Sequence, residues 1–237
     1  MTDASTLPTY RLADGIAVIT LDDGKANAMS MEVVTTLDAH LDQALADGAR
    51  ALVLTGRPGR FSAGFDLAEM TESVESMRNL VARGGRWLLR LYGYALPTVA
   101  ACTGHALAGG ALILLASDVR IGADMPAKIG LNEVAIGMPL PKFAVELARD
   151  RIETHAFTDA TIGGTVYDPA GAARVGFLDR VSPEAEVLPQ ALAEAERLGA
   201  LRAGAYARTK TNARAAMIEA QVANLVHDLS TVEGPTP

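Results

Sequence analysis

The residues best suited to chemistry lie between positions 98 and 133. Small residues, with Gly109 and Gly110 at their centre, lead into residues 112–116, a run so apolar all round that it predicts a buried helix. Glycines at a helix start leave backbone N–H groups open to a ligand, and the helix dipole favours negative charge there. Glu133 follows as a lone carboxylate in an apolar segment. This combination predicts an anion site with a base beside it.

A second glycine-rich loop covers residues 56–67 and directly follows residues 51–55, an apolar run typical of a strand buried on both faces. Ligands of open α/β sheets gather beyond the carboxyl ends of strands, so we expect substrate at this loop and at the turn around Gly109. If the two turns converge, each offers a backbone N–H to an oxygen that becomes negative in a transition state. A thioester that turns into an enolate fits such a site. Burial would raise the pKa of Glu133 and suit it to proton transfer.

The elements that must position these turns follow from hydrophobic periodicity and turn residues. Residues 10–21 form two apolar-alternating runs around Asp14-Gly15, which predicts a hairpin, and Ser30 is a suitable N-cap for a helix over residues 31–46. The other expected elements are strands at 98–102, 118–123 and 175–181 and helices at 71–94, 142–147, 152–159, 169–175, 185–198 and 201–226. The glycine pair at 84–85 favours a break in the first of these helices.

Composition excludes several classes of protein. The 237 residues show no internal repeat or linker, which predicts one domain of α/β type, and a net charge of −7 argues against a nucleic-acid partner. No apolar run reaches the ~18 residues of a membrane span and residues 1–8 are polar, so we expect a soluble, cytoplasmic protein. One cysteine, Cys102, and four scattered histidines imply neither a disulfide nor a metal site.

Two segments resemble the oxyanion-hole segments of the crotonase, or enoyl-CoA hydratase/isomerase, superfamily. They are FSAGFDL at residues 61–67 and GHALAGGALILLASDVRIGA at residues 104–123, and the loop at residues 25–28 precedes them in the right order. The resemblance extends from the N-terminal hairpin to about Val181. It implies an α/β spiral of ββα units over residues 1–181, C-terminal helices over 182–229 that help to build a homotrimer or a dimer of trimers, and a tail over 230–237.

The resemblance also implies roles for individual residues. The backbone amides of Ala63 and Gly109 would hold the thioester oxygen, and Glu133 would be the catalytic base. The residues expected along the bound coenzyme A thioester are Lys25, Ala26, Ala28, Phe65, Asp66, Leu67, Gly110 and Leu112. The implied partner is an acyl-CoA of fatty-acid metabolism, with no nucleic acid or membrane. No separate cofactor is implied, because coenzyme A is part of the substrate.

Leu112 decides between the reactions of the family. Hydratases that resemble this chain carry a glutamate at the position of Leu112 and another at the position of Glu133, and the pair activates water. The sequence IGLNE that ends at Glu133 looks instead like the Δ3,Δ2-enoyl-CoA isomerases, in which one glutamate moves a proton from C2 to C4. We therefore favour an isomerase. Two alternatives stay open, a hydratase with a second acid or base from Asp22, Asp23 or Glu69, and an acyl-CoA-binding protein without turnover.

Several residues also admit a purely structural role. Asp66 is a possible helix cap, Lys25 a surface charge, and Trp87 either core or part of an acyl pocket. Cys102 and His105 lie close in sequence, but a lone cysteine at the end of a buried strand favours packing over a thiol nucleophile. A dinucleotide-binding oxidoreductase is disfavoured, because no Gly-x-Gly-x-x-Gly follows a first strand.

Overall fold

The structure is a computed structural model that describes residues 6–232. Its largest sheet has six strands, which are, in spatial order, β1 (Thr9–Ala13), β2 (Ile16–Leu21), β4 (Ala51–Gly56), β7 (Thr98–Cys102), β9 (Val119–Ala123) and β11 (Arg180–Ser182). Only the β1–β2 pair is antiparallel; the other four pairs are parallel. A smaller parallel sheet contains β10 (Ile129–Gly130), β8 (Gly104–Leu107) and β5 (Gly59–Ser62), and β3 (Ala28–Met29) pairs with β6 (Gly64–Phe65).

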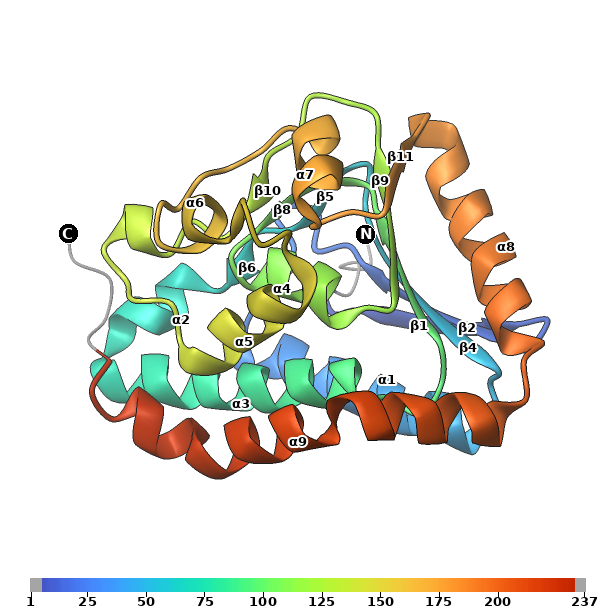
Figure 1. Cartoon of the computed structure of the whole chain (residues 1–237), viewed down its shortest axis with the longest axis horizontal. Helices are drawn as coiled ribbons and strands as arrows, with labels where there is room; N and C mark the ends of the chain where they lie inside the picture. Colours follow the sequence, from blue (N-terminus) through green and yellow to red (C-terminus); the bar gives the residue numbers. More distant parts are fainter. Residues whose placement is uncertain (1–5, 233–237) are drawn as a thin grey trace, which may run out of the picture.

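The helices cover both faces of the large sheet (Figure 1). They are α1 (Met31–Ala46), α2 (Leu67–Glu72), α3 (Val74–Tyr92), α4 (Gly109–Ala116), α5 (Lys142–Arg151), α6 (Phe157–Thr161), α7 (Pro169–Val175), α8 (Val187–Gly199) and α9 (Ala203–Leu229), with 3₁₀ turns η1 (Val134–Ile136) and η2 (Glu184–Glu186). The chain repeatedly passes from a strand of the large sheet to a short strand outside it and then to a helix, as in β2–β3–α1 and β7–β8–α4. This is the predicted spiral of ββα units.

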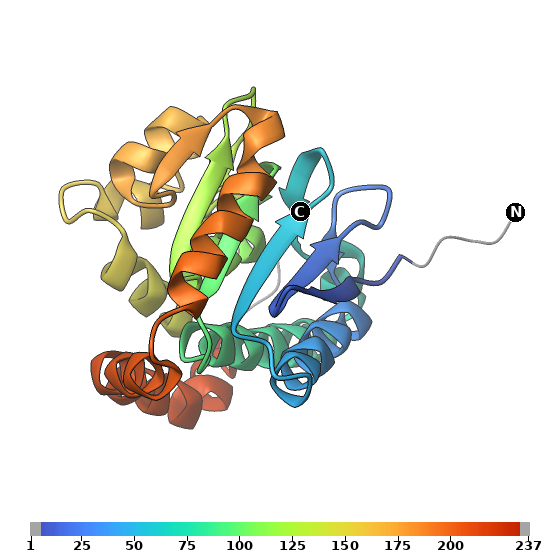
Figure 2. The ribbon, with the colours of Figure 1, turned by 90° about the vertical axis from the view of Figure 1, so that its right-hand side faces the viewer.

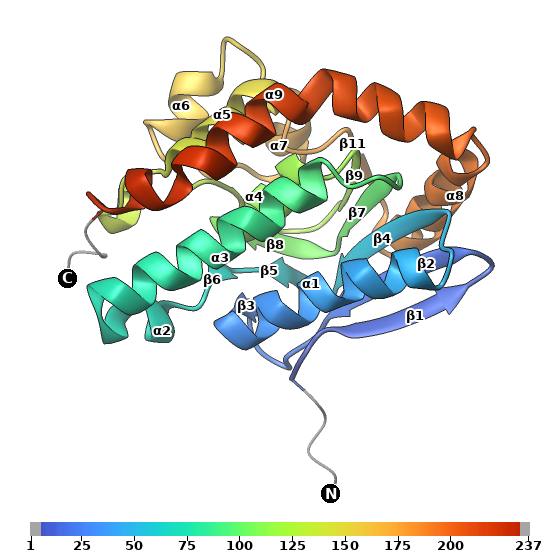
Figure 3. The ribbon, with the colours of Figure 1, turned by 90° about the horizontal axis from the view of Figure 1, so that it is seen from below.

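The large sheet separates two apolar cores. On one face α8 packs against β2, β4, β7 and β9, as Figure 2 shows. On the other face α1, α3 and α4 bury the main core, and α9 runs along α3 and α5 (Figure 3). Buried β4 and β7 are apolar except for Thr55 and Thr98, because each strand is covered on both sides.

Local signals at the N-terminus were sufficient to predict its structure. The hairpin turns at Asp14 (φ 52°) and Gly15 (φ 75°), and two consecutive positive φ values are those of the turn that matches strand twist. Ser30 caps α1, because its Oγ accepts a hydrogen bond of 3.2 Å from the amide of Val33. The hairpin and the helix are confirmed with the predicted boundaries nearly unchanged.

The glycine pair in α3 does not break the helix, so this prediction is wrong. A Cβ on Gly84 would lie 2.1 Å from Cε1 of Phe65, and one on Gly85 would lie 2.9 Å from Cε1 of Phe143. Because neither glycine has a side chain, the rings of Phe65 and Phe143 pack directly against an unbroken helix. The expected loop at 56–67 also contains β5 and β6. The helix expected at 152–159 begins only at Phe157, as the short α6.

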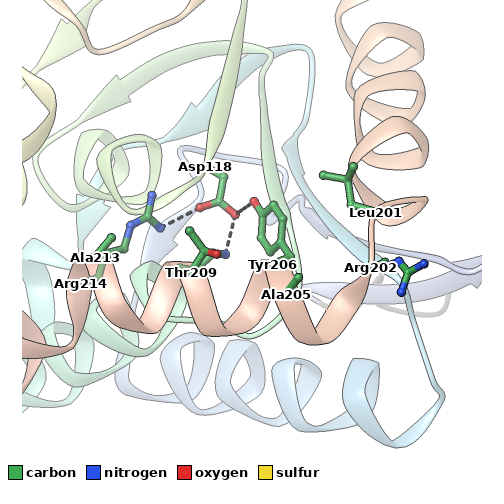
Figure 4. A pocket seen from close by; sticks show the side chains of 9 residues that line it. Asp118, Leu201, Arg202, Ala205, Tyr206, Thr209, Ala213 and Arg214 are labelled. Atoms are coloured by element: carbon green, nitrogen blue, oxygen red, sulfur yellow. Dashed lines mark hydrogen bonds and ion pairs between the residues drawn. The ribbon is translucent and has the colours of Figure 1, made fainter.

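A buried ion-pair network fixes α9 to the sheet at Asp118, just before β9 (Figure 4). Its carboxylate accepts hydrogen bonds from Lys210 Nζ (2.6 Å), Arg214 Nη1 (2.7 Å) and the Tyr206 hydroxyl (2.8 Å). Burial opposes the charge, but Lys210 and Arg214 outweigh it and hold the pKa of Asp118 below its usual range. Lys210 also donates to the carbonyl of Tyr94 at 2.8 Å, which connects α9 to the end of α3.

Within residues 6–232, no helix has the length and apolarity that a membrane crossing requires. The same residues contain no group of three or more histidine, cysteine or acidic side chains placed to hold a metal ion. The end of the predicted tail, residues 233–237, and residues 1–5 lie outside the described part of the chain.

Candidate active site

A cavity of about 230 Å³ lies between α2, α3, α4, α5 and η1. Its lining residues are Ala63, Phe65, Leu67, Met70, Val81, Leu107, Ala108, Leu112, Asn132, Glu133, Ile136, Met138, Pro141 and Phe143. All but Asn132 and Glu133 have apolar side chains. Trp87 is buried in the core and does not line the cavity, whereas Val81 of the same helix does. The shape and composition suit an acyl chain.

Glu133 is the only ionisable side chain among the lining residues that the structure describes. It is 8 % exposed, and its Oε2 has no hydrogen-bond partner. Burial raises the pKa of Glu133 to about 7, against a smaller opposing contribution from its own backbone N–H. Its carbonyl accepts hydrogen bonds from Met138 (2.9 Å) and Ile136 (3.1 Å), so the backbone that carries the acid is held in place. An acid with this pKa can take up and release a proton near neutral pH.

The first turn of α4 faces the cavity across Ala108. Ala108 has φ 49°, an unfavourable value for a residue with a Cβ, and its amide donates to the carbonyl of Gly130 at 3.0 Å. The helix ladder starts when Leu112 donates to the carbonyl of Ala108 at 3.0 Å. The amides of Gly109 and Gly110 therefore belong to the first turn, where no intrahelical acceptor exists. The strained turn at Ala108 aims the start of α4 at the site.

The two glycine-rich loops meet, as the sequence predicted. Gly64 has φ +91°, and a Cβ there would lie 2.8 Å from the amide nitrogen of Gly109. A Cβ on Gly109 would lie 3.4 Å from the amide nitrogen of Phe65. Gly110 packs as closely, since its Cβ would lie 2.2 Å from the carbonyl oxygen of Ser62. The amides of Phe65 and Gly109 are therefore neighbours at the edge of the cavity.

Ala63 requires a correction. Its amide donates to the carbonyl of Ala26 at 3.0 Å, which contradicts the prediction of a free donor at this position. Asp66 N–H points toward β3, where it bonds to the carbonyl of Met29 at 3.1 Å. Because successive amides of a strand point to opposite edges, the Phe65 N–H points away from β3, on the side of Gly109. The motif located the loop, but only the strand pairing indicates which amide is available.

The loop at residues 25–28 lies outside the cavity. Lys25 is exposed, and its carbonyl accepts a 2.7 Å hydrogen bond from Arg57 Nη1. The loop is held by Asn27, a buried residue with φ 55° whose Nδ2 donates to the carbonyls of Leu21, Arg60 and Phe61 at 2.8–3.1 Å. The sequence indicates that Asn27 permits a tight backbone turn, but it does not reveal the three carbonyls that its side chain holds. The role of Lys25, Ala26 and Ala28 toward coenzyme A stays a prediction.

Asp66 is a helix cap, one of the two roles considered for it. Its Oδ1 accepts hydrogen bonds from the amides of Ala68 (2.8 Å) and Glu69 (3.2 Å) at the start of α2. The neighbouring Leu67 is 55 % exposed while it lines the cavity, so it lies at the cavity mouth.

None of the three acids considered as a second catalytic group lines the cavity. Asp23 Oδ1 accepts hydrogen bonds from the amides of Lys25 and Asn27, and Glu69 Oε2 accepts one from the amide of Met31 at 2.9 Å. Asp22 lies 3.7 Å from Arg57 in an exposed ion pair. Leu112, 1 % exposed, lines the cavity at the position where the resemblance implies a second carboxylate in hydratases.

Cys102 and His105 have separate partners. The thiol of Cys102 donates to the carbonyl of Gly104 at 3.2 Å, and burial raises its pKa to about 12. His105 Nδ1 accepts a hydrogen bond of 3.0 Å from the amide of Lys128. A fully buried thiol with this pKa is not a nucleophile near neutral pH.

The fold and site define an α/β protein whose apolar cavity has two neighbouring main-chain amides at its edge and one buried acid among its lining residues. A sequence model of the enoyl-CoA hydratase/isomerase family matches residues 11–234, and the chain belongs to this family. The predicted superfamily is confirmed, and so is the predicted fold class.

Several relatives share the sequence and the fold. The chain is 37 % identical to human enoyl-CoA delta isomerase 1, mitochondrial, over 187 residues, which are 75 % of this chain and 60 % of the human protein. It is equally 37 % identical to a putative enoyl-CoA hydratase of Thermus thermophilus over 189 residues, 77 % of this chain and 74 % of that protein. The crystal structure of an enoyl-CoA hydratase/isomerase family protein from Pseudomonas syringae matches with a TM-score of 0.92 and 42 % identity, over 94 % of this chain and 97 % of that one.

Proposed function

We propose that this chain is an enoyl-CoA isomerase of fatty-acid metabolism, which converts 3-enoyl-CoA thioesters into 2-enoyl-CoA thioesters. The main support for the proposal is the single buried acid of the cavity. Glu133 lines an apolar cavity that has the amides of Phe65 and Gly109 at its edge. Leu112 occupies the position at which a hydratase of the family would need a second carboxylate. Moving a proton between two carbons requires one acid–base group and no positioned water.

In the proposed reaction the thioester oxygen accepts hydrogen bonds from the amides of Phe65 and Gly109. The carboxylate of Glu133 removes a proton from C2, and the electron pair of the broken C–H bond forms the C1–C2 double bond of an enolate whose oxygen carries the charge. The enolate then collapses. A double bond forms between C2 and C3, the electrons of the former C3–C4 double bond take the proton of Glu133 at C4, and the carboxylate is restored.

The acyl group would occupy the cavity, and coenzyme A would leave it past Leu67. Its adenosine and phosphate parts would lie along Lys25, Ala26 and Ala28, which border the strand pair β3–β6. The only positive charge in this loop is Lys25. No cofactor beyond the substrate takes part in the proposed reaction. The C-terminal helices α8 and α9 would serve a homotrimer or a dimer of trimers, which light scattering can test.

A hydratase is the second candidate, because the Thermus thermophilus relative at 37 % identity is named a putative enoyl-CoA hydratase. Hydration adds water across the C2–C3 bond, and two carboxylates usually orient that water in this family. In the described residues the cavity contains only one carboxylate. An acyl-CoA-binding protein without turnover is the third candidate.

Separate incubations with 3-enoyl-CoA and 2-enoyl-CoA distinguish the three. We expect the first to isomerise and the second to resist hydration. Glu133→Gln should lower isomerisation by about 10² to 10⁴-fold, the usual contribution of a general acid–base. Glu72→Gln, on the exposed face of α2, is the matched control and should leave the rate unchanged. Hydration of 2-enoyl-CoA without isomerisation of 3-enoyl-CoA would establish the hydratase, and binding without any turnover the third candidate.

A further inference from the structure

Asn132 is the second polar side chain of the cavity, and nothing in the proposed reaction uses it. Its Oδ1 is completely buried and has no hydrogen-bond partner. Oε2 of the next residue, Glu133, is buried and unpaired in the same way. A buried polar atom without a partner is unfavourable and rare in folded proteins, so two such acceptors on consecutive residues of one cavity require an explanation.

The proton cycle of Glu133 supplies that explanation. While the enolate exists, Glu133 is a carboxylic acid, and its O–H is a donor that needs an acceptor. The other twelve lining residues offer apolar side chains to the cavity, so Asn132 Oδ1 is the one side-chain acceptor within it among the residues described. The two Cα atoms are neighbours in the chain, about 3.8 Å apart, and both residues line the same cavity of about 230 Å³.

We propose that Asn132 is a positioning residue whose side-chain oxygen accepts a hydrogen bond from protonated Glu133 between the removal of the proton at C2 and its return at C4. The inference rests on the proposed function only for the stage of the reaction at which Glu133 is protonated. The hydrogen bond itself joins two side chains of the protein and does not require substrate. It stabilises the neutral form of the acid and thereby adds to the effect of burial.

The surroundings make this contact measurable. The elements packed around Glu133 are α2, α3, α4, α5 and the β8–α4 turn, and their lining residues include no charged or titratable side chain. No neighbouring charge contributes to the shift in the pKa of Glu133 either. A change at Asn132 is therefore not masked by another ionisable group.

The direction in which the pKa of Glu133 changes when Asn132 is replaced distinguishes between the possible contacts. If Asn132 accepts from the acid, its removal destabilises the neutral form and lowers the pKa of Glu133. If the amide nitrogen instead donates to the carboxylate, its removal raises the pKa. A purely structural asparagine leaves the pKa of Glu133 where it is.

The test is a titration of the Glu133 carboxyl by ¹³C NMR in protein labelled at glutamate side chains, with Glu133→Gln to assign the signal. Asn132→Leu keeps the volume and removes the acceptor, and Asn132→Ala is a second variant in case the leucine disturbs the cavity. We expect both to increase the acid dissociation constant of Glu133 by roughly 3- to 10-fold, the effect of one ordinary hydrogen bond. Asn132→Asp should change it in the opposite direction, because a second carboxylate opposes the ionisation of the first.

Turnover gives an independent readout. Asn132→Leu should lower kcat for 3-enoyl-CoA with little change in KM, and the midpoint of its pH profile should move to lower pH. An unchanged or raised pKa of Glu133 in both variants overturns the inference. If the wild-type protein does not isomerise 3-enoyl-CoA, the proposed function fails, and the titration still decides whether the contact exists.

Discussion

Gly64 and Gly109 touch across two loops that are far apart in the sequence, and a Cβ on Gly64 would lie 2.8 Å from the amide nitrogen of Gly109. The contact brings the amide of Phe65 beside the first turn of α4. A side chain at either position would separate the two loops. The geometry of the site thus depends on the absence of two side chains as much as on the presence of Glu133.

Gly64→Ala should therefore impair catalysis. The new Cβ meets the Gly109 amide, and the backbone there, at φ +91°, is unfavourable for alanine. Displacing one donor of such a pair commonly costs about 10² to 10³ in kcat. Gly204→Ala is the control, since Gly204 lies in α9 with no atom within 4 Å of the new Cβ. It should leave kcat unchanged and raise Tm by a few degrees at most. Wild-type kcat in Gly64→Ala would contradict the role of this contact.

Activity should rise with pH. The raised pKa of Glu133, about 7, means that the carboxylate needed to remove the C2 proton forms only as the pH passes through that value. We expect kcat/KM for 3-enoyl-CoA to fall about tenfold per pH unit well below pH 7 and to level off above it. A profile that stays flat from pH 5 to 8 would show that another group moves the proton.

Glu133 should also destabilise the fold at neutral and alkaline pH. Its pKa is higher in the folded state (about 7) than in the unfolded chain (4.5), so the unfolded state ionises first, and stability declines as pH rises between these values. This difference in pKa corresponds to about 3 kcal/mol. Glu133→Gln should accordingly raise the free energy of unfolding at pH 8 by up to this amount and have little effect at pH 4. Urea unfolding at the two pH values measures this, and an equal effect at both would refute the assignment.

The attachment of α9 should depend on Asp118. Asp118→Asn leaves Lys210 and Arg214 buried without their carboxylate, and breaking a buried pair in this way typically costs about 3–5 kcal/mol. Glu194→Gln removes the partner of Arg197, a pair whose arginine is largely exposed, and should cost under about 1 kcal/mol. Chemical denaturation of both variants makes the comparison. Equal losses would mean that the buried network does not hold the helix.

The sequence predicted much of this fold because its signals are local. Ser30 begins α1, Asp14-Gly15 turns the hairpin, and the apolar run from Ala51 predicts a strand covered on both faces. Glycines were harder to interpret. In the sequence Gly84-Gly85 indicates a helix break, whereas in the structure the two glycines leave room for two aromatic rings against the helix. Short strands such as β5 and β6 are stabilised by pairing with strands distant in the sequence, and they are too short to show an alternating hydrophobic pattern.

The site was predictable to the level of its loops and its acid. The position of Glu133 in an apolar segment indicated burial, and the structure agrees. Whether Ala63 or Phe65 supplies the oxyanion-binding amide was not predictable from the sequence, because it depends on which amides are already hydrogen-bonded to β3 and the residues before it. Asn132 gave no signal on its own, since an unpaired buried oxygen becomes visible only when every neighbour is placed.

The most direct test is a crystal structure of the protein with an unreactive enoyl-CoA thioester analogue. We expect the thioester oxygen within about 3 Å of the amide nitrogens of Phe65 and Gly109, and a carboxylate oxygen of Glu133 within about 3.5 Å of both C2 and C4. A thioester oxygen bound away from these two amides, or a Glu133 side chain turned out of the cavity, would contradict the proposed reaction.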